Sequence, residues 1–199
     1  MKIPADTIAR LSHLLPDEPT NDPMDCFRLD NGLVMTTNKA FMAIDHVAEF
    51  EGVFYIRADR ALIEQCRIEA QWSSVIEFTP VPAINYTTAM SSMGWKTGDN
   101  LGVWPTAPSE WDSWRERILD RCLLPLETPN GHAVFDAEQL ELLARCSPSG
   151  RISMEKCADP VQRPMVVRDI DSPDWIGFFS ARISDGRHHY PAGVPGWLR

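Results

Sequence analysis

The chain has 199 residues, of which 44% are hydrophobic and 24% charged, a composition typical of a folded protein and not of a disordered one. Its 28 acidic and 19 basic residues give a net charge of −9, which argues against binding nucleic acid or a membrane through the whole surface but not against a local basic face. No run approaches the roughly 18 apolar residues of a membrane span, and the N-terminus lacks the pattern of a secretory signal, so we expect a cytoplasmic protein without membrane contact.

The five cysteines are odd in number and irregularly spaced, and no CxxC pair is present. The spacing therefore predicts neither a disulfide framework nor a structural zinc site, and a reducing compartment is the natural environment. Because the dipole at a helix C-terminus opposes thiolate formation, we expect core residues and not nucleophiles where a cysteine ends a helix. The cysteines that end predicted helices are Cys66, Cys122 and Cys146.

The N-terminal half begins with a predicted helix and a run of short strands. Asp6 is the predicted N-cap of a helix over 7–15, which a proline-rich loop ends. Three β-like runs follow within 26–47 and are separated by predicted tight turns at 30–32 and 38–39. This pattern indicates a meander of three antiparallel strands.

A short strand at 53–56 leads into a second helix at 58–67, which has two chemically different sides. Its apolar side consists of Ala58, Leu62, Ile63 and Cys66. The residues that fall within an arc of about 80° on the other side are Arg57, Arg60, Glu64 and Arg67. Further strands are predicted at 74–80, 84–90 and 94–104.

After a predicted linker at 105–109 the order of elements restarts. Capping-box spacing predicts one helix over 109–122 and another over 136–146. Strands are then expected at 150–157, 163–170 and 174–183, and the residues from 187 to the C-terminus are loop-like.

Sliding residues 55–66 by 80 positions pairs Cys66 with Cys146, which suggests a weak internal duplication. We therefore predict an α+β protein of two related domains, 1–105 and 106–199, each placing helices on antiparallel sheets. The second domain is shorter and carries the C-terminal tail.

Two segments resemble the domains of bacterial DNA sliding clamps. FRLDNGLVMTTNKAFMAIDHV followed by VFYIRADRALIEQCR is similar to the hairpin strands and the strand entering the second helix of a clamp domain. VFDAEQLELLARCSPSGRISMEKCADPVQRPMVVRDIDSPDWIGFFSARI resembles the end of such a domain, and together the segments cover around half the chain. The resemblance implies a ring around duplex DNA with basic helices lining the hole, so that three copies of a two-domain chain would form a homo-trimer.

On this resemblance, certain arginines are expected to face the phosphates of DNA, which would supply sequence-independent, salt-sensitive affinity. They are Arg57, Arg60, Arg67, Arg117 and Arg121, with Arg10 as a weaker candidate. The alternative for the helix at 58–67 is an ordinary solvated face with an Arg60–Glu64 pair four residues apart.

The helix expected at 136–146 departs from this pattern because it carries Glu138 and Glu141 against a single Arg145. Together with the shortened second domain, this leaves a second hypothesis open. The protein would then be a phage or mobile-element interaction or inhibitor module that keeps the clamp-like fold without encircling DNA, and its partner would be a replication or host protein.

Signatures of enzymes are missing from the sequence, which has no GxGxxG, Walker A, GxSxG or HExxH motif. Asp169 and Asp171 lie in a polar, turn-like segment, where solvation accounts for them without catalysis. Adjacent His188 and His189 cannot share one face of a helix or strand, so we expect no metal site there. The sequence thus predicts a non-enzymatic protein without a cofactor.

Overall fold

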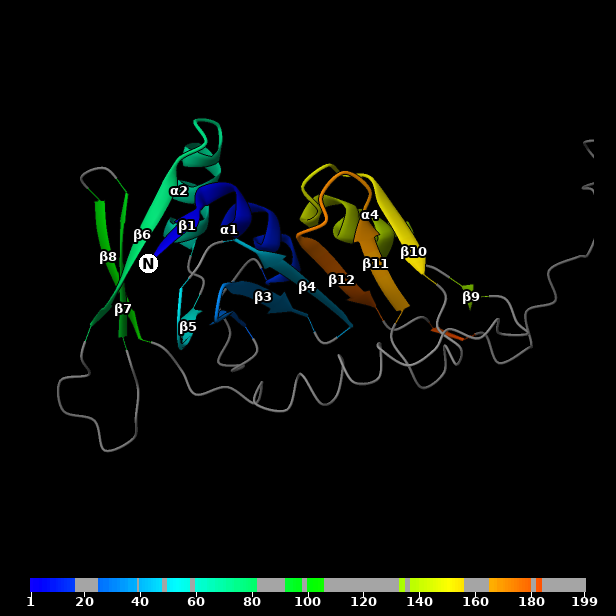
Figure 1. Ribbon diagram of the computed structural model, residues 1–199, viewed down its shortest axis with the longest axis horizontal. Helices are drawn as coiled ribbons and strands as arrows, with labels where there is room; N and C mark the ends of the chain where they lie inside the picture. Colours follow the sequence, from blue (N-terminus) through cyan, green and yellow to red (C-terminus); the bar gives the residue numbers. More distant parts are fainter. Residues whose placement is uncertain are drawn as a thin grey trace, which may run out of the picture.

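A computed structural model of the chain has an α+β architecture with one layer of helices and two main antiparallel sheets (Figure 1). The helices and sheets of the predicted fold class are confirmed. The structure describes residues 1–16, 25–38, 40–47, 50–57, 60–81, 92–97, 100–105, 133–134, 137–155, 165–179 and 182–183.

The N-terminus forms strand β1 (Lys2–Pro4), helix α1 (Ala5–Leu11) and the short 3₁₀ helix η1 (Ser12–Leu14). The predicted capping role of Asp6 is wrong, because the N-cap is Pro4 and no side chain caps the helix. Proline is tolerated there since the first amide groups of a helix have no intrahelical partner. Asp6 lies in the first turn and forms an ion pair with Arg10 instead.

A seven-stranded sheet has the strand order β10-β11-β12-β4-β3-β2-β5. Its N-terminal strands are β2 (Cys26–Asp30), β3 (Leu33–Thr37), β4 (Phe41–His46) and β5 (Val53–Arg57). Its C-terminal strands are β10 (Ile152–Glu155), β11 (Met165–Asp169) and β12 (Trp175–Phe179). The predicted meander is confirmed, and Asn31 and Gly32 take the positive φ values of its first turn, 47° and 86°.

The second sheet has the order β1-β6-β7-β8. Its other strands are β6 (Val75–Val81), β7 (Ser92–Thr97) and β8 (Asn100–Pro105). A single strand at 94–104 is therefore a wrong prediction, since this segment forms two strands that pair with each other. The strand predicted at 174–183 is also divided, into β12 and β13 (Arg182–Ile183), and β13 pairs with β9 (Ala133–Val134).

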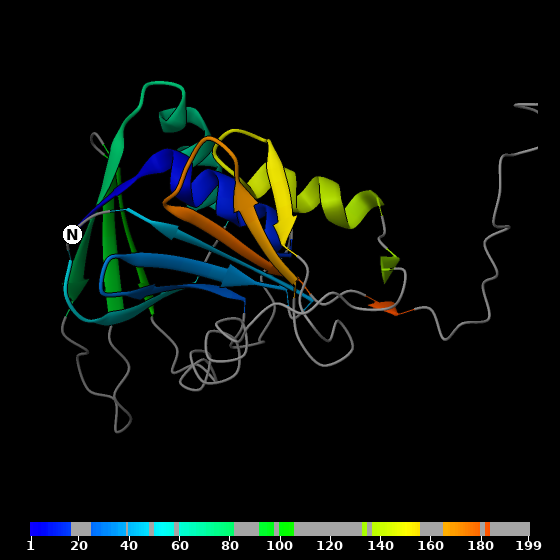
Figure 2. The ribbon, with the colours of Figure 1, turned by 45° about the vertical axis from the view of Figure 1, so that its right-hand side comes forward.

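Helices α1, α2 (Arg60–Ala70) and α4 (Ala137–Cys146) form one layer over the seven-stranded sheet, with α1 between the other two (Figures 1 and 2). The main core lies between this helix layer and both sheets, because it also includes Ile3 of β1 and Phe78 of β6. It contains Phe27, Leu29 and Trp175 from the strands, and Leu62 and Leu143 from the helices, all fully buried. The apolar side predicted for the second helix thus faces the core.

The opposite face of the sheet is apolar as well. Its cluster consists of Met35, Met42, Ile44, Val166 and Phe178, each at most 5% exposed. Alternate residues of each strand point to opposite faces, so the two clusters divide the strands by position parity.

β12 joins the two halves of the chain by pairing with β4, from Trp175 opposite Asp45 to Phe179 opposite Phe41. The rings of Phe41 and Phe179 stack across this joint with centroids 5.3 Å apart. The chain repeats one unit on either side of it, because α2 precedes the meander β6-β7-β8 and α4 precedes the meander β10-β11-β12.

Several predictions from the sequence concern segments outside the described residues. They are the strand at 84–90, the linker after Pro105, the helix at 109–122 and the C-terminal tail. The domain boundary near residue 106 stays a prediction.

Candidate nucleic-acid interface

α2 presents a charged side to solvent because its apolar side is fixed in the core. Leu62 and Cys66, one helical turn apart, are fully buried. Arg60, Glu64 and Arg67 are exposed on the helix surface. The Nε of Arg60 donates a hydrogen bond of 2.8 Å to the Oε1 of Glu64, which is the pair expected from the sequence. Ion pairs this exposed contribute little to stability, and the guanidinium of Arg60 lies at the surface beside Glu64.

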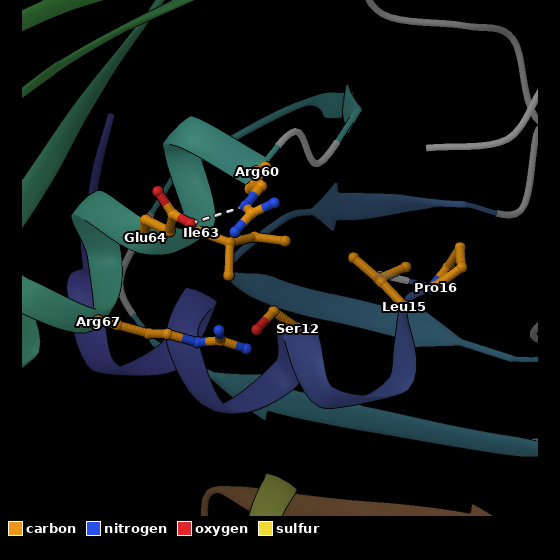
Figure 3. A pocket seen from close by; sticks show the side chains of 7 residues that line it. All are labelled: Ser12, Leu15, Pro16, Arg60, Ile63, Glu64 and Arg67. Atoms are coloured by element: carbon orange, nitrogen blue, oxygen red, sulfur yellow. Dashed lines mark hydrogen bonds and ion pairs between the residues drawn. The ribbon is translucent and has the colours of Figure 1, made fainter. Parts of the chain in front are cut away.

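A groove of about 350 Å³ lies between α2 and the segment formed by η1 and the two residues after it (Figure 3). Its lining combines two guanidinium groups with one carboxylate, one hydroxyl and an apolar part. The residues that line it are Ser12, Leu15, Pro16, Arg60, Ile63, Glu64 and Arg67. No carboxylate within the described ranges forms an ion pair with Arg67, so its charge is the less compensated of the two.

His13 lies where η1, α2 and α4 meet, half-buried near two arginines. Its pKa is lowered from the usual 6.5, first by burial and then by repulsion from Arg67 and Arg145. A histidine so placed is mostly neutral at neutral pH. The junction therefore combines charges from α2 and α4, two helices that are far apart in the sequence.

Arg10 lies inside the molecule and not on the basic surface. Its side chain is 14% exposed and donates to three acceptors: Asp6 Oδ2 at 2.6 Å, Asp45 Oδ2 at 2.7 Å and the carbonyl oxygen of Cys146 at 2.8 Å. Thr7 also donates to Asp45, at 3.1 Å. Because its donors are occupied by internal acceptors, we leave Arg10 out of the phosphate-facing set.

The Arg10–Asp45 pair links α1 to the strand β4, and the Cys146 carbonyl extends it to the end of α4. Burial raises the pKa of the Asp45 carboxyl above its usual 3.8, and the attraction of Arg10 offsets only part of that rise. For Arg10, burial opposes the charged form, but Asp45 and Asp6 outweigh it and raise the pKa of the guanidinium. The network holds the helix layer in place on the sheet.

Of the other predicted arginines, the structure describes only the backbone of Arg57. Arg57 ends β5, where its backbone lies opposite Cys26, and its side chain is outside the described residues. Arg117 and Arg121 lie outside them entirely. On α4, Arg145 forms an ion pair with Glu141, which agrees with the acidic character expected for this helix.

Asp169 is a structural carboxylate, so its interpretation as a solvated turn residue is wrong. It is 5% exposed and accepts hydrogen bonds from the backbone amides of Ser149, Asp171 and Ser172, each at 2.8 Å. Burial opposes its charge, but these bonds outweigh it and lower the pKa of the carboxyl. The residue ties the loop after α4 to the turn after β11.

The buried thiols of Cys66 and Cys146 are unreactive as nucleophiles. Burial raises the pKa of both Cys66 and Cys146 to about 12, so neither forms a thiolate at neutral pH. In the described part of the chain, no three histidine, cysteine, aspartate or glutamate residues are grouped to hold a metal ion. No helix in that part is long and apolar enough to span a bilayer.

Comparison with solved structures places this architecture among known folds. The subunit beta of DNA polymerase III from Borrelia burgdorferi superimposes with a TM-score of 0.60 over 94% of the chain at 7% identity. The fold is that of a bacterial DNA sliding clamp. The sliding clamp of Bacillus subtilis gives 0.54 over 92% at 11% identity, and the beta subunit of Pseudomonas aeruginosa gives 0.54 over 92% at 10%.

The chain spans 64–66% of the length of these clamps. No protein-family model matches the chain, and no curated protein matches its sequence. The clamp resemblance inferred from the two sequence segments is confirmed at the level of fold.

Proposed function

We propose that the protein is a non-enzymatic, clamp-like factor of DNA replication or metabolism that binds duplex DNA through its helix layer. The observation that carries the proposal is the exposed Arg60 and Arg67 on α2, in a fold shared with DNA sliding clamps. Arg57, Arg117 and Arg121 complete the proposed phosphate-facing set. Guanidinium groups suit this role because they stay charged and match the geometry of phosphate oxygens.

The affinity expected from this surface is modest. Glu64 neutralises part of the charge of Arg60, and α4 contributes an Arg145 that is already paired with Glu141. The binding should therefore be independent of DNA sequence and should weaken steeply with salt, since it releases counterions from the phosphates. Such loose, sequence-independent contact is what a protein that moves along DNA needs.

The test is fluorescence anisotropy of a labelled duplex at low salt, comparing the unaltered chain with Arg60→Ala/Arg67→Ala. We expect a loss of affinity on the order of tenfold and a salt dependence reduced by about two counterions. Arg168→Ala is the matched control: this exposed arginine lies on β11, on the side of the sheet opposite the helices, and its removal should leave binding unchanged.

Absence of duplex binding at low salt would refute the proposal, and so would equal losses in the double variant and the Arg168→Ala control. Either outcome would shift weight to a module that binds a replication or host protein without contacting DNA.

A further inference from the structure

The groove beside α2 brings three kinds of surface together. Figure 3 shows the side chain of Arg67 extending toward Ser12, and both residues line the groove. The Arg60–Glu64 pair lines it nearer the N-terminus of α2, and Ile63 lies between that pair and Arg67 along the groove. The groove therefore has a cationic part, an apolar part and a part that carries a carboxylate.

The apolar part has two walls. Ile63 lines it from α2, and Leu15 and Pro16 line it from the segment after η1. Leu15 is buried and Ile63 packs against the main core, so the fold holds both walls in place. At about 350 Å³ the groove lies at the lower end of the size range of small-molecule sites, which suits a ligand of about one nucleotide.

The polar groups of the lining determine which ligand chemistry fits. Two guanidinium groups against one carboxylate give a net positive charge, which favours an anion over a zwitterion. The hydroxyl of Ser12 donates to the carbonyl oxygen of Ala9 at 2.7 Å, which leaves Arg67 to bind the anion in that part of the groove. The Oε1 of Glu64 accepts from Arg60 at 2.8 Å, and a carboxylate retains further acceptor positions after one such bond.

We propose that the groove binds a nucleoside monophosphate unit whose base carries an exocyclic amino group, either as a free nucleotide or as an unpaired nucleotide of a DNA strand. The phosphate contacts Arg67, the base lies between Ile63 and Leu15, and its amino group donates to Glu64. Guanidinium groups match phosphate oxygens, apolar side chains enclose an extruded base, and carboxylates accept from the amino group of cytosine. The inference rests on the proposed function, since Arg67 is a phosphate contact in both, and it adds recognition of a base.

This role accounts for a carboxylate on a surface that is proposed to face phosphates. Glu64 neutralises part of the charge of Arg60 and repels phosphate, so contact with the DNA backbone alone would be stronger without it. A hydrogen bond from a base to this carboxylate offsets that repulsion. Glu64 thus has opposite effects on the two kinds of binding, which makes the inference testable.

NMR titration of the ¹⁵N-labelled chain at low salt tests the site with three probes: deoxycytidine monophosphate, deoxyuridine monophosphate and inorganic phosphate. Uracil has a carbonyl group where cytosine has its amino group. We expect the cytidine nucleotide to shift the amide signals of residues 12–15 and 63–67 and to bind on the order of tenfold more tightly than the uridine nucleotide. Inorganic phosphate should bind most weakly, because it makes no contact with the apolar walls.

Glu64→Met separates base recognition from charge. It should abolish the preference for the cytidine nucleotide, whereas the affinity for inorganic phosphate should stay equal or rise, because a negative charge is removed. Glu141→Met is the matched control: Glu141 is an exposed carboxylate on α4 that pairs with Arg145 four residues away, and its removal should leave the preference unchanged. Arg67→Met should weaken the binding of all three probes.

Fluorescence anisotropy distinguishes the two sources of the nucleotide. The probes are a duplex with one unpaired deoxycytidine, the same duplex with one unpaired deoxyuridine, and the fully paired duplex. A preference for the first over the second that is lost in Glu64→Met identifies an unpaired nucleotide of a strand as the ligand. Binding of the free cytidine nucleotide without this preference among the duplexes identifies a free nucleotide.

The inference is overturned if the cytidine and uridine nucleotides bind equally, if the shifted amides lie away from the groove, or if Glu64→Met and Glu141→Met change the preference alike. The fully paired duplex tests the proposed function separately. Binding of that duplex with no preference for cytidine would refute the inference alone, whereas specific binding of the cytidine nucleotide without duplex binding would refute the proposed function alone.

Discussion

The guanidinium of Arg10 shows how a single buried charge can join distant parts of a chain. Its acceptors come from its own helix, from β4 and from the C-terminus of α4, and the last is 136 residues away in the sequence. The C-terminal carbonyls of a helix carry partial negative charge and suit a cation. A helical projection of the sequence places Arg10 off the apolar face of its helix. It does not show that Asp45 and Cys146 lie nearby, so it cannot distinguish a buried cation from a solvated one.

Replacing Arg10 with methionine should destabilise the protein by about 3–5 kcal/mol, because it leaves the carboxylate of Asp45 buried without its counter-charge. Burial already raises the folded-state pKa of Asp45 above its unfolded value, and without Arg10 it rises further. Such a group contributes stability at low pH that is lost as pH rises through the folded-state pKa. Urea unfolding of Arg10→Met should therefore show stability falling as pH increases above about 4.

Two controls accompany this measurement. Arg10→Met/Asp45→Asn should recover part of the loss and flatten the pH dependence, since the buried group then no longer ionises. Arg145→Met removes an exposed, paired arginine and should change stability by less than about 1 kcal/mol. Equal stability of Arg10→Met and the unaltered chain at neutral pH would contradict the role given to the network.

At the scale of elements, the periodicity of α2 was predictable and its surroundings were not. Leu62 and Cys66 are buried and Arg60 is paired with Glu64, as the spacing indicates. Which helices lie next to the charged side of α2 is decided by tertiary packing. Contact between η1 and α4 brings His13 near Arg145, and α2 adds Arg67. No local pattern predicts this meeting of three helices, because it depends on how they pack on the sheet.

The pKa of His13 depends on burial first and on Arg67 and Arg145 second. Arg67→Ala should raise the pKa of His13, yet leave it below 6.5, because burial is the larger cause of its depression. Arg60→Ala should have little effect, since Arg60 is not among the causes. NMR titration of the imidazole signal, assigned with His13→Gln, provides the measurement. Duplex DNA bound next to Arg67 should also raise this pKa, because phosphates stabilise the protonated ring. An unchanged pKa in Arg67→Ala would contradict the arrangement of the junction.

At the scale of the whole molecule, the sequence predicted the order of the elements better than the contacts between segments that are distant in the chain. The α+β class, the meander and the repetition of helix and strands were predictable, because each depends on local periodicity and turn residues such as Asn31 and Gly32. Strand β1 was missed, since three residues carry no periodicity and their partner in β6 lies more than 70 positions away. The β12–β4 joint was missed for the same reason.

The seven-stranded sheet leads us to expect that both halves of the chain unfold together. β12 pairs with β4 over five residues, and the main core mixes Phe41 and Leu62 with Leu143 and Trp175. Removing the C-terminal half would uncover this core and leave the edge of β4 unpaired. Hydrogen exchange measured by mass spectrometry should therefore give the amides of β3–β4 and β11–β12 the same free energy of opening, equal to that of global unfolding.

The same reasoning predicts that a fragment ending at Pro105 is less stable than the full chain or self-associates through β4. The fragment ends near residue 106, where the sequence predicts a domain boundary. Urea unfolding of the fragment and of the full chain provides the comparison. Two separate exchange classes, or a monomeric fragment as stable as the full chain, would show that the β12–β4 joint is a docking contact between independent units. One shared class would show that the joint, more than the repeat, defines the folding unit, because the buried Trp175 and Phe41 then lose their packing in a single step.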